Sequence, residues 1–287
     1  MSKAVVWMFG TLISFCFMAI GARELSDEIM MSQVMFFRSM IGLIVILSIV
    51  FMTKNKRVFS THRFMLHSSR NVFHFIGQYG WLVGITALPL AEVFAIEFTV
   101  PVWTVIIAWL FLGEKLTKIK LLATLLGLMG VAVIVNPNIE GINSYSFIVL
   151  GAAFCYAISH TSTKALSKTE SPLTILLFMC VIQLPIGGIV TIGHWVTPTI
   201  PQLLWLIVIG STGLTAHYCM AKAMQYAEVS FVVILDFLRL PAIGLIGALM
   251  YGESIKYSLL IGAVIMLLGN VLIINSNAVK LRKVELK

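Results

Sequence analysis

The chain has 287 residues, of which 59% are hydrophobic and only 11% are charged, and its mean hydropathy is +0.99. This composition excludes an ordinary water-soluble domain, because soluble domains carry about 25% charged residues. The formal net charge is +8. We attribute this charge to the membrane topology described below, and we expect no nucleic-acid partner.

Ten apolar stretches are long enough to cross a bilayer as helices, since a span needs about 20 residues. The alternating pattern of a membrane-spanning barrel is absent, which predicts an all-α integral membrane protein. The ten predicted transmembrane helices cover residues 4–22, 30–52, 66–88, 90–112, 119–137, 146–165, 173–193, 203–222, 229–250 and 258–275.

The basic residues predict how these helices are oriented. With a cytoplasmic N-terminus, 15 of the 20 Lys and Arg fall in cytoplasmic segments, whereas Arg23 and Lys256 face outward. Because cytoplasmic loops are enriched in Lys and Arg, both termini are predicted to be cytoplasmic. The four cysteines lie within spans, so the sequence predicts neither a disulfide nor a metal site, and no cofactor.

The second half of the chain repeats part of the first half. Residues 97–138 correspond to residues 236–277 at a constant shift of 139, and Gly113-Glu114 falls on Gly252-Glu253. Five helices per half is an odd number, so the halves must have opposite orientations in the membrane. Inverted repeats around a central site are typical of secondary transporters.

This repeat predicts the domain organisation. The first five-helix repeat covers residues 1–138, the second covers residues 145–277, and a basic cytoplasmic tail covers residues 278–287.

Charged side chains inside predicted spans indicate where function lies, because each costs about 2.5–3.5 kcal/mol to insert. Glu97 and Asp236 are equivalent positions of the two repeats, and Arg239 shares a helix face with Asp236. In a purely structural role, Arg239 pairs with Asp236 or with Glu97. In a functional role, Arg239 clamps a carboxylate or another anion of a substrate, and Glu97 or Asp236 carries a coupling proton.

Arg38 lies near the middle of the second span, too deep to reach either surface comfortably. Two roles stay open for it. One is a salt bridge to Glu97, and the other is a second contact with a substrate anion.

The third span carries a polar stripe on one helix face, at Arg70, His74, Gln78 and Trp81. Arg70 is near the cytoplasmic end, and we expect it to reach the lipid headgroups. His74 and Gln78 lie deeper, so they line a cavity or form hydrogen bonds between helices. Trp81 is expected to stack beside a substrate or to anchor the helix at the interface.

Two further spans carry polar stripes. On the sixth span the stripe is Tyr156, His160 and Thr163. On the eighth span it is Ser211, Thr215, Tyr218 and Lys222. Of these residues, Tyr218 is expected beside the substrate, whereas His160 and the nearby His217 are interpreted as packed, hydrogen-bonded side chains.

The repeated motifs resemble the EamA family of the drug/metabolite transporter superfamily, over nearly the whole chain. The resemblance rests on a proline followed by Gly-Glu in each half, on a later glycine, and on the segment 235–241. These residues are Pro101, Gly113-Glu114 and Gly130, and in the second half Pro241, Gly252-Glu253 and Gly269. Arg38, within Phe36-Phe37-Arg38, and Arg70 resemble a branch that includes S-adenosylmethionine importers.

The resemblance implies a bacterial inner-membrane carrier that works by alternating access. Its substrate would lie in a central cavity lined by the third, fourth, eighth and ninth spans. The fifth and tenth spans, 119–137 and 258–275, would pack at the periphery and provide a homodimer contact.

The sequence therefore predicts a secondary transporter, driven by an ion gradient or by exchange, of a small polar or zwitterionic metabolite such as S-adenosylmethionine or an amino acid. An exporter of other metabolites or drugs with the same fold is the alternative. The predicted substrate-binding residues are Arg38, His74, Gln78, Trp81, Glu97, Tyr218, Asp236 and Arg239.

Other function classes lack their signatures in the sequence. A GxxxxGK[ST] loop is missing, so we expect no ATP hydrolysis. An intramembrane enzyme would need a convergent nucleophile–base or metal set, such as paired His and Asp on facing helices, and the sequence shows no His-x-x-Glu-His or Asp-rich metal motif. A channel would form a pore from several subunits, whereas this chain contains an internal duplication.

Overall fold

The computed structural model describes residues 2–25, 29–88, 93, 96–135, 144–251 and 257–285. Secondary structure within these ranges is entirely helical, as predicted. The motif at Gly252-Glu253 and the end of the repeat at residues 136–138 lie outside the described residues, as does the predicted outward position of Lys256.

The helices agree with the predicted spans to within a few residues, apart from the fourth, the ninth and the tenth, whose helix continues ten residues beyond the predicted end at 275, into the predicted basic tail. They are α1 (Ser2–Leu25), α2 (Met31–Thr53), η1 (Lys56–Phe59), α3 (Phe64–Ala87), α5 (Val100–Leu112), α6 (Lys118–Val135), α7 (Ser144–Leu166), α8 (Pro172–Thr191), α9 (Ile200–Tyr226), α10 (Val229–Leu235), η2 (Asp236–Leu238), α11 (Arg239–Tyr251) and α12 (Tyr257–Glu285).

The ninth predicted span is broken, which corrects the continuous helix expected over 229–250. It forms α10, the 3₁₀ turn η2 and then α11. Pro241 explains the break, because proline has no N–H and its ring crowds the carbonyl four residues earlier, at Phe237. In the fourth predicted span a turn at 98–99 precedes α5, which has proline in its first turn. Both interruptions lie next to a carboxylate within the bundle, the buried Glu97 and the partly buried Asp236.

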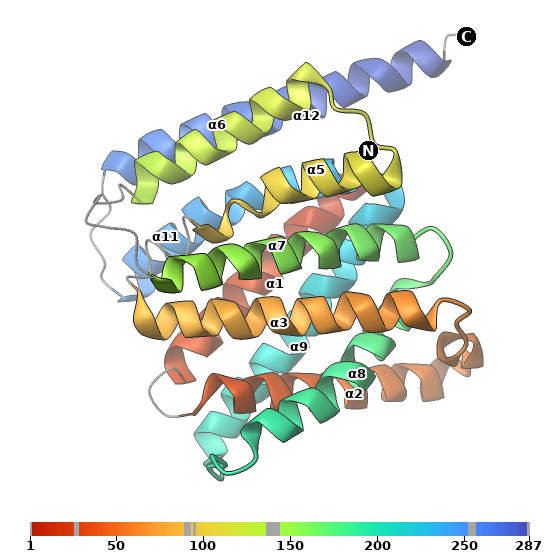
Figure 1. Cartoon of the computed structure of the whole chain (residues 1–287), viewed down its shortest axis with the longest axis vertical. Coiled ribbons are helices and arrows are strands. Elements are labelled where there is room, and N and C mark those ends of the chain that lie inside the picture. Colours follow the sequence, from red (N-terminus) through yellow and green to blue (C-terminus); the bar gives the residue numbers. More distant parts are fainter. Residues whose placement is uncertain are drawn as a thin grey trace.

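Helix pairing reflects the duplication of the chain. Helix α1 of the first repeat packs against α9 of the second. The corresponding helices, α7 for α1 and α3 for α9, form the equivalent pair. Each of the other two major pairs, α2 with α8 and α6 with α12, joins equivalent helices of the two repeats. The pair α6 and α12 forms an outer layer along one side of the bundle (Figure 1).

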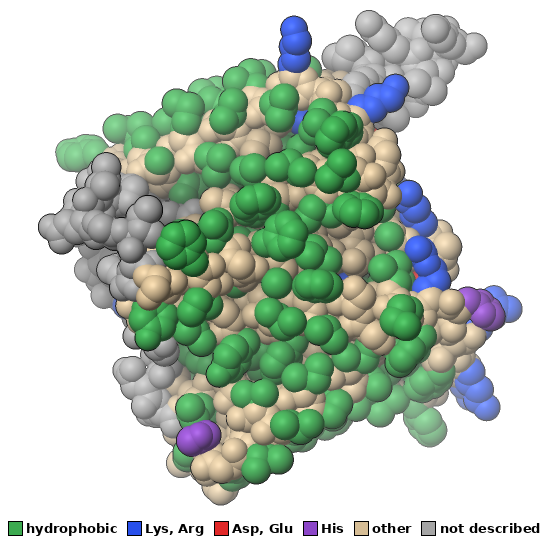
Figure 2. All heavy atoms as spheres, in the orientation of Figure 1, with side chains coloured by type: hydrophobic (Ala, Val, Ile, Leu, Met, Phe, Trp, Pro, Cys, Tyr) green, Lys and Arg blue, Asp and Glu red, His purple; other side chains and the backbone are tan. Residues whose placement is uncertain are grey.

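The surface of the bundle is that of a multi-pass membrane protein. Six described helical segments are long and apolar enough to cross a bilayer, one of them the broken run over Val229–Gly247, and two shorter apolar helices accompany them. Figure 2 shows hydrophobic side chains spread across the visible face, whereas Lys and Arg gather along one edge. In Figure 1 that is the edge at which α1 begins. This one-sided distribution is the pattern from which a cytoplasmic N-terminus is predicted.

The Gly113-Glu114 motif ties the two repeats together. Helix α5 ends at Gly113, whose φ of 68° lies in the left-handed region that favours glycine. The next residue, Glu114, accepts hydrogen bonds at the start of α10, from the backbone N–H of Val229 (2.8 Å) and the hydroxyl of Ser230 (2.5 Å). Lys120 Nζ lies 3.1 Å from Glu114 Oε2. A carboxylate at a helix N-terminus is also favoured by the helix dipole.

Both charges of this pair are buried, since Glu114 is 7% exposed and Lys120 is 4% exposed. Lys120 also pairs with Glu228, at 2.7 Å, so its charge lies between two carboxylates. We call Glu114, Lys120, Glu228 and Ser230 the Glu114 cluster. It fixes the turn between α9 and α10 to the end of α5, across the boundary between the repeats.

Glu114→Ala should lower stability strongly, because it leaves Lys120 and the first N–H groups of α10 without their buried acceptor. Removing one partner of a buried ion pair costs about 3–5 kcal/mol. Glu114→Gln should cost less, since an amide oxygen still accepts from the N–H groups. Thermal unfolding in detergent measures both variants, with Lys115→Ala at an exposed neighbouring position as control. A melting temperature for Glu114→Ala equal to that of Lys115→Ala would contradict this role.

Candidate functional site

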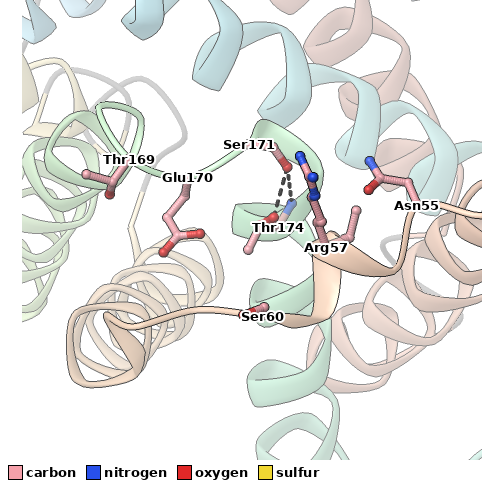
Figure 3. Close-up of a pocket in the computed structure, with 8 residues that line it drawn as sticks. Asn55, Arg57, Ser60, Thr169, Glu170, Ser171 and Thr174 are labelled. Carbon is pink, nitrogen blue, oxygen red and sulfur yellow. Dashed lines mark hydrogen bonds between the residues drawn. The ribbon is translucent and has the colours of Figure 1, made fainter.

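A polar pocket at the edge of the bundle is the first candidate site. It lies between η1 and the turn from α7 to α8, and Figure 3 shows the polar side chains around it. Several of these groups have local structural partners. Ser171 accepts a hydrogen bond from the N–H of Thr174 and caps α8, and Glu170 accepts one from Thr61. This pocket therefore belongs to the connections between helices.

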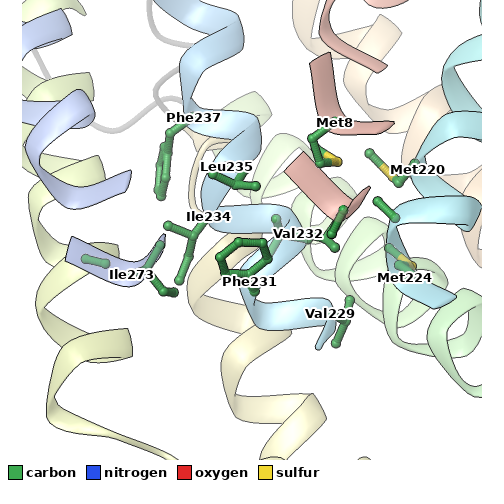
Figure 4. Packing of buried hydrophobic residues seen from close by; sticks show 14 of the residues in the cluster. Met8, Met220, Met224, Val229, Phe231, Val232, Ile234, Leu235, Phe237 and Ile273 are labelled. Carbon is green, nitrogen blue, oxygen red and sulfur yellow. The ribbon is translucent and has the colours of Figure 1, made fainter. Parts of the chain in front are cut away.

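The interior of the bundle holds a second candidate, built around η2. Apolar packing fixes this turn, because α10 is buried along its whole length. Figure 4 shows Phe231, Val232 and Leu235 of α10 and Phe237 of η2 packed among residues of α1, α9 and α12. The ring of Phe237 also stacks on Phe98, with centroids 5.8 Å apart. The break in the helix is thus held rigidly between the two repeats.

Three charged side chains meet at this break. Arg239 Nη2 lies 2.8 Å from Glu97 Oε1 and 3.2 Å from Asp236 Oδ2. We call these residues the ion triad. The guanidinium also lies over the rings of Phe15 and Phe98, at 5.2 and 5.5 Å from their centroids. Such contacts stabilise a cation where water is excluded. Both structural pairings considered for Arg239 therefore form at the same time.

The ion triad retains unused hydrogen-bonding capacity. Glu97 Oε2, Asp236 Oδ1 and Arg239 Nε are buried and have no hydrogen-bond partner in the described part of the chain. Two carboxylates against one guanidinium also give the triad a formal charge of −1 when both are ionised. This arrangement can accept a proton or a cationic group.

Arg38 lies in a different environment. It is 7% exposed, and its Nη2 donates to Gln78 Oε1 at 2.8 Å and to Gln183 Oε1 at 3.0 Å. The amide nitrogen of Gln183 in turn contacts His74 Nδ1 at 2.9 Å. We call these four residues the amide cluster. The salt bridge considered between Arg38 and Glu97 does not form, because two amides bind Arg38 and Arg239 binds Glu97.

Aromatic rings connect the amide cluster to the ion triad. The ring of His74 lies 4.9 Å from that of His217, and the ring of His217 lies 5.5 Å from that of Phe15. Phe15 lies under Arg239. A continuous series of contacts therefore crosses the interior, from Arg38 at one end to Asp236 at the other, with contributions from α1, α2, α3, α8 and α9.

The remaining predicted residues lie elsewhere around these clusters. Trp81 packs against an apolar cluster that includes Val149 of α7. Tyr218 packs against apolar residues of α2 and α8, and its ring meets that of Trp7 at 5.9 Å. The prediction that Arg70 reaches the headgroups is wrong. It is 3% exposed and donates to Thr163 Oγ1 at 3.1 Å, because the interface of α3 with α7 offers it polar partners.

The sequence prediction missed one central residue, Gln183, and did not place a second, His217, next to His74. Gln183 binds both Arg38 and His74, but it is the lone central polar residue in an otherwise apolar stretch of α8 and belongs to no stripe. His217 was interpreted as a packed side chain, and its contact with His74 depends on how α9 is rotated against α3. A buried glutamine in an apolar helix is itself a signal, because its amide needs partners.

Comparison with known proteins identifies the kind of protein. The EamA-like transporter family matches residues 2–136 and 143–275. The chain is 25% identical over 275 residues to an S-adenosylmethionine uptake transporter of Rickettsia bellii, covering 96% of this chain and 94% of that protein. It is 30% identical over 232 residues to a riboflavin transporter of Vibrio cholerae, covering 80% and 78%.

The fold is also known from solved structures. One crystal structure, 14% identical in sequence, aligns with a TM-score of 0.81 over 94% of this chain and 96% of that chain. Together with the family match, this fold defines a multi-pass membrane transporter, not an enzyme. The chain belongs to the EamA-like transporter family, which confirms the resemblance inferred from the repeated motifs.

Arg239→Ala should destabilise the protein, because it leaves two buried carboxylates without their shared cation. We expect a loss of about 3–5 kcal/mol, measured as a lower melting temperature in detergent. Arg239→Met combined with Glu97→Gln and Asp236→Asn should recover much of the loss, since no unpaired charge remains. Arg57→Ala, at an exposed position in η1, is the matched control. Equal melting temperatures for Arg239→Ala and Arg57→Ala would show that the triad does not stabilise the fold.

Proposed function

We propose that this protein is a secondary transporter of a small zwitterionic metabolite, S-adenosylmethionine or a similar amino-acid-like compound, across a bacterial inner membrane. The observation that supports this proposal is the separation of charge in the interior. The amide cluster contains a guanidinium with neutral partners, and the ion triad contains an excess carboxylate. A zwitterion complements both ends.

The two clusters would bind opposite groups of one substrate. Arg38 would bind the anionic group, since its planar guanidinium suits a carboxylate. Glu97 or Asp236 would bind the cationic group through the oxygen that lacks a partner, or would carry a coupling proton in its place. His74 lies between these ends, since its ring contacts that of His217, and it would contact the middle of the substrate together with Gln78, which binds Arg38.

Relatives support this substrate class without defining the compound. S-adenosylmethionine carries an amino acid group and a sulfonium cation, and a relative over nearly the full chain is named for its uptake. Other relatives are named for riboflavin, which has no carboxylate. The charges at both ends of the site favour the zwitterion over riboflavin.

Alternating access would then use the contacts between repeats. The ion triad joins α10, η2 and α11 to the segment before α5, so substrate binding at Glu97 or Asp236 would weaken a link between the halves. No ATP-driven step is included, and the direction of net transport follows the gradient. A homodimer through α6 and α12 remains part of this proposal.

Proteoliposomes containing the purified protein test this function. We expect saturable uptake of labelled S-adenosylmethionine that is accelerated by unlabelled compound trapped inside. Glu97→Gln should reduce uptake by roughly 10–100-fold, the equivalent of losing a charge-assisted hydrogen bond of about 1.5–3 kcal/mol. Lys115→Ala, an exposed change, should transport normally.

Three outcomes would contradict the proposal in different ways. Normal uptake by a folded Glu97→Gln protein would exclude the triad from the site. Uptake of riboflavin but not of S-adenosylmethionine would overturn the zwitterion and keep the transporter. Single-channel conductance steps would replace the carrier mechanism by a channel.

A further inference from the structure

Arg38 is a buried cation without a buried counter-ion. It is 7% exposed, and no carboxylate in the described part of the chain forms an ion pair with it. The buried ion pairs described above are those of Lys120 and Arg239. A buried charge is normally paired, because water no longer stabilises it. Within the described part of the chain, the charge of Arg38 is therefore not neutralised by a counter-ion.

The partners of Arg38 orient it without neutralising it. Gln78 and Gln183 both accept from the same nitrogen, Nη2. A guanidinium carries five N–H donors, and both of these hydrogen bonds use the one nitrogen Nη2. The side chain is fixed in place, and it retains both its charge and its hydrogen-bonding capacity.

Gln183 can contribute only an amide oxygen to Arg38, because the rest of its amide is already bound. Its Nε2 donates to the backbone carbonyl of Asn71 at 3.3 Å and lies 2.9 Å from His74 Nδ1. The side chain is 1% exposed, so it has little room to turn. A glutamate would have nearly the same shape at this position and would provide a full negative charge to Arg38.

We propose that Arg38, framed by Gln78 and Gln183, is an anion-binding site for a carboxylate group, and that the neutral amide of Gln183 is the residue that keeps this site selective for anions. The proposal rests on the proposed function only in assigning that carboxylate to the transported compound. The site itself follows from burial, missing counter-charge and the fixed orientation of Gln183.

The substitution Gln183→Glu tests this directly, because it inserts the missing counter-ion. In purified protein in detergent, we expect Gln183→Glu to melt at least about 2 °C above a matched control, Gln33→Glu. Both substitutions remove an N–H donor to a backbone carbonyl, and Gln183→Glu gains an ion pair with Arg38. Gln33 is another fully buried glutamine, but both ends of its amide bind the backbone of Val196 in place of a guanidinium. There the new carboxylate should lower the melting temperature.

A small probe anion provides the second readout. Replacing sodium chloride by sodium acetate at constant ionic strength should raise the melting temperature of the wild-type protein by mass action. This gain should be lost in Gln183→Glu, whose own carboxylate occupies Arg38, and in Arg38→Met. Gln183→Met should keep the gain, since Arg38 stays charged.

Either of two results would overturn the proposal. One is destabilisation by Gln183→Glu as large as that by Gln33→Glu, which would mean that Arg38 is already neutralised. The other is an acetate gain that is absent from the wild-type protein or equal in Gln183→Glu. Neither readout requires transport. The proposed anion site can therefore be disproved while uptake of S-adenosylmethionine is confirmed, and the anion site can be confirmed while uptake is not observed.

Discussion

The burial of one guanidinium between two carboxylates is the constraint on which the centre of this protein depends. Glu97 comes from the first repeat, and Asp236 and Arg239 come from the second. Separately, each would be an isolated charge in an apolar bundle, which is costly. The lowest-energy arrangement brings all three together, and it thereby fixes the broken helix α10–η2–α11 against the segment that leads into α5.

The Glu114 cluster secures the other end of the same contact. Helix α5 has Glu97 before its first residue and Glu114 after its last, and both carboxylates bind the second repeat. One contact is an ion pair in the bundle interior. The other is a helix cap combined with an ion pair to Lys120. The two repeats are therefore joined by hydrogen bonds and ion pairs as well as by apolar packing. Such polar contacts can break and re-form with a different partner when the repeats move.

Sequence reasoning identified the architecture because it depends on strong, local signals. Long apolar stretches predict spans, and the equivalence of Glu97 and Asp236 follows directly from the repeat. The break at η2 could have been anticipated from Pro241, although a proline in a membrane helix often produces only a kink. The position of Gln183 could not, because its partners Arg38 and His74 belong to two other helices. Contacts between helices depend on the rotation of each helix about its axis. In a membrane helix, apolar side chains face both the lipid and the bundle, so the sequence pattern defines this rotation poorly.

Arg70 and Tyr218 show the same limit from opposite directions. Arg70 was expected at the headgroups because it lies near a helix end, but polar groups on α7 and α3 bind it inside. Tyr218 was expected in the interior because it lies on a polar stripe, but the adjacent His217 faces His74 instead. Neighbouring residues of a helix point about 100° apart, so a small error in the rotation of α9 exchanges the expected position of Tyr218 with that of His217.

The close approach of α6 to η2 connects the outer layer of the bundle to its charged centre. A Cβ atom at Gly127 would lie 2.3 Å from the ring of Phe237, so the helix and the ring are in direct contact. Phe237 is flanked in sequence by Asp236 and lies two residues before Arg239. Helix α6 and its partner α12 expose apolar side chains such as Leu125 and Leu268. These lipid-facing helices are thus in direct contact with the segment that bears Asp236 and Arg239, through Phe237 and through contacts of α12 with η2 and α11. A change of bilayer thickness that tilted α6 or α12 would therefore act on that segment as well.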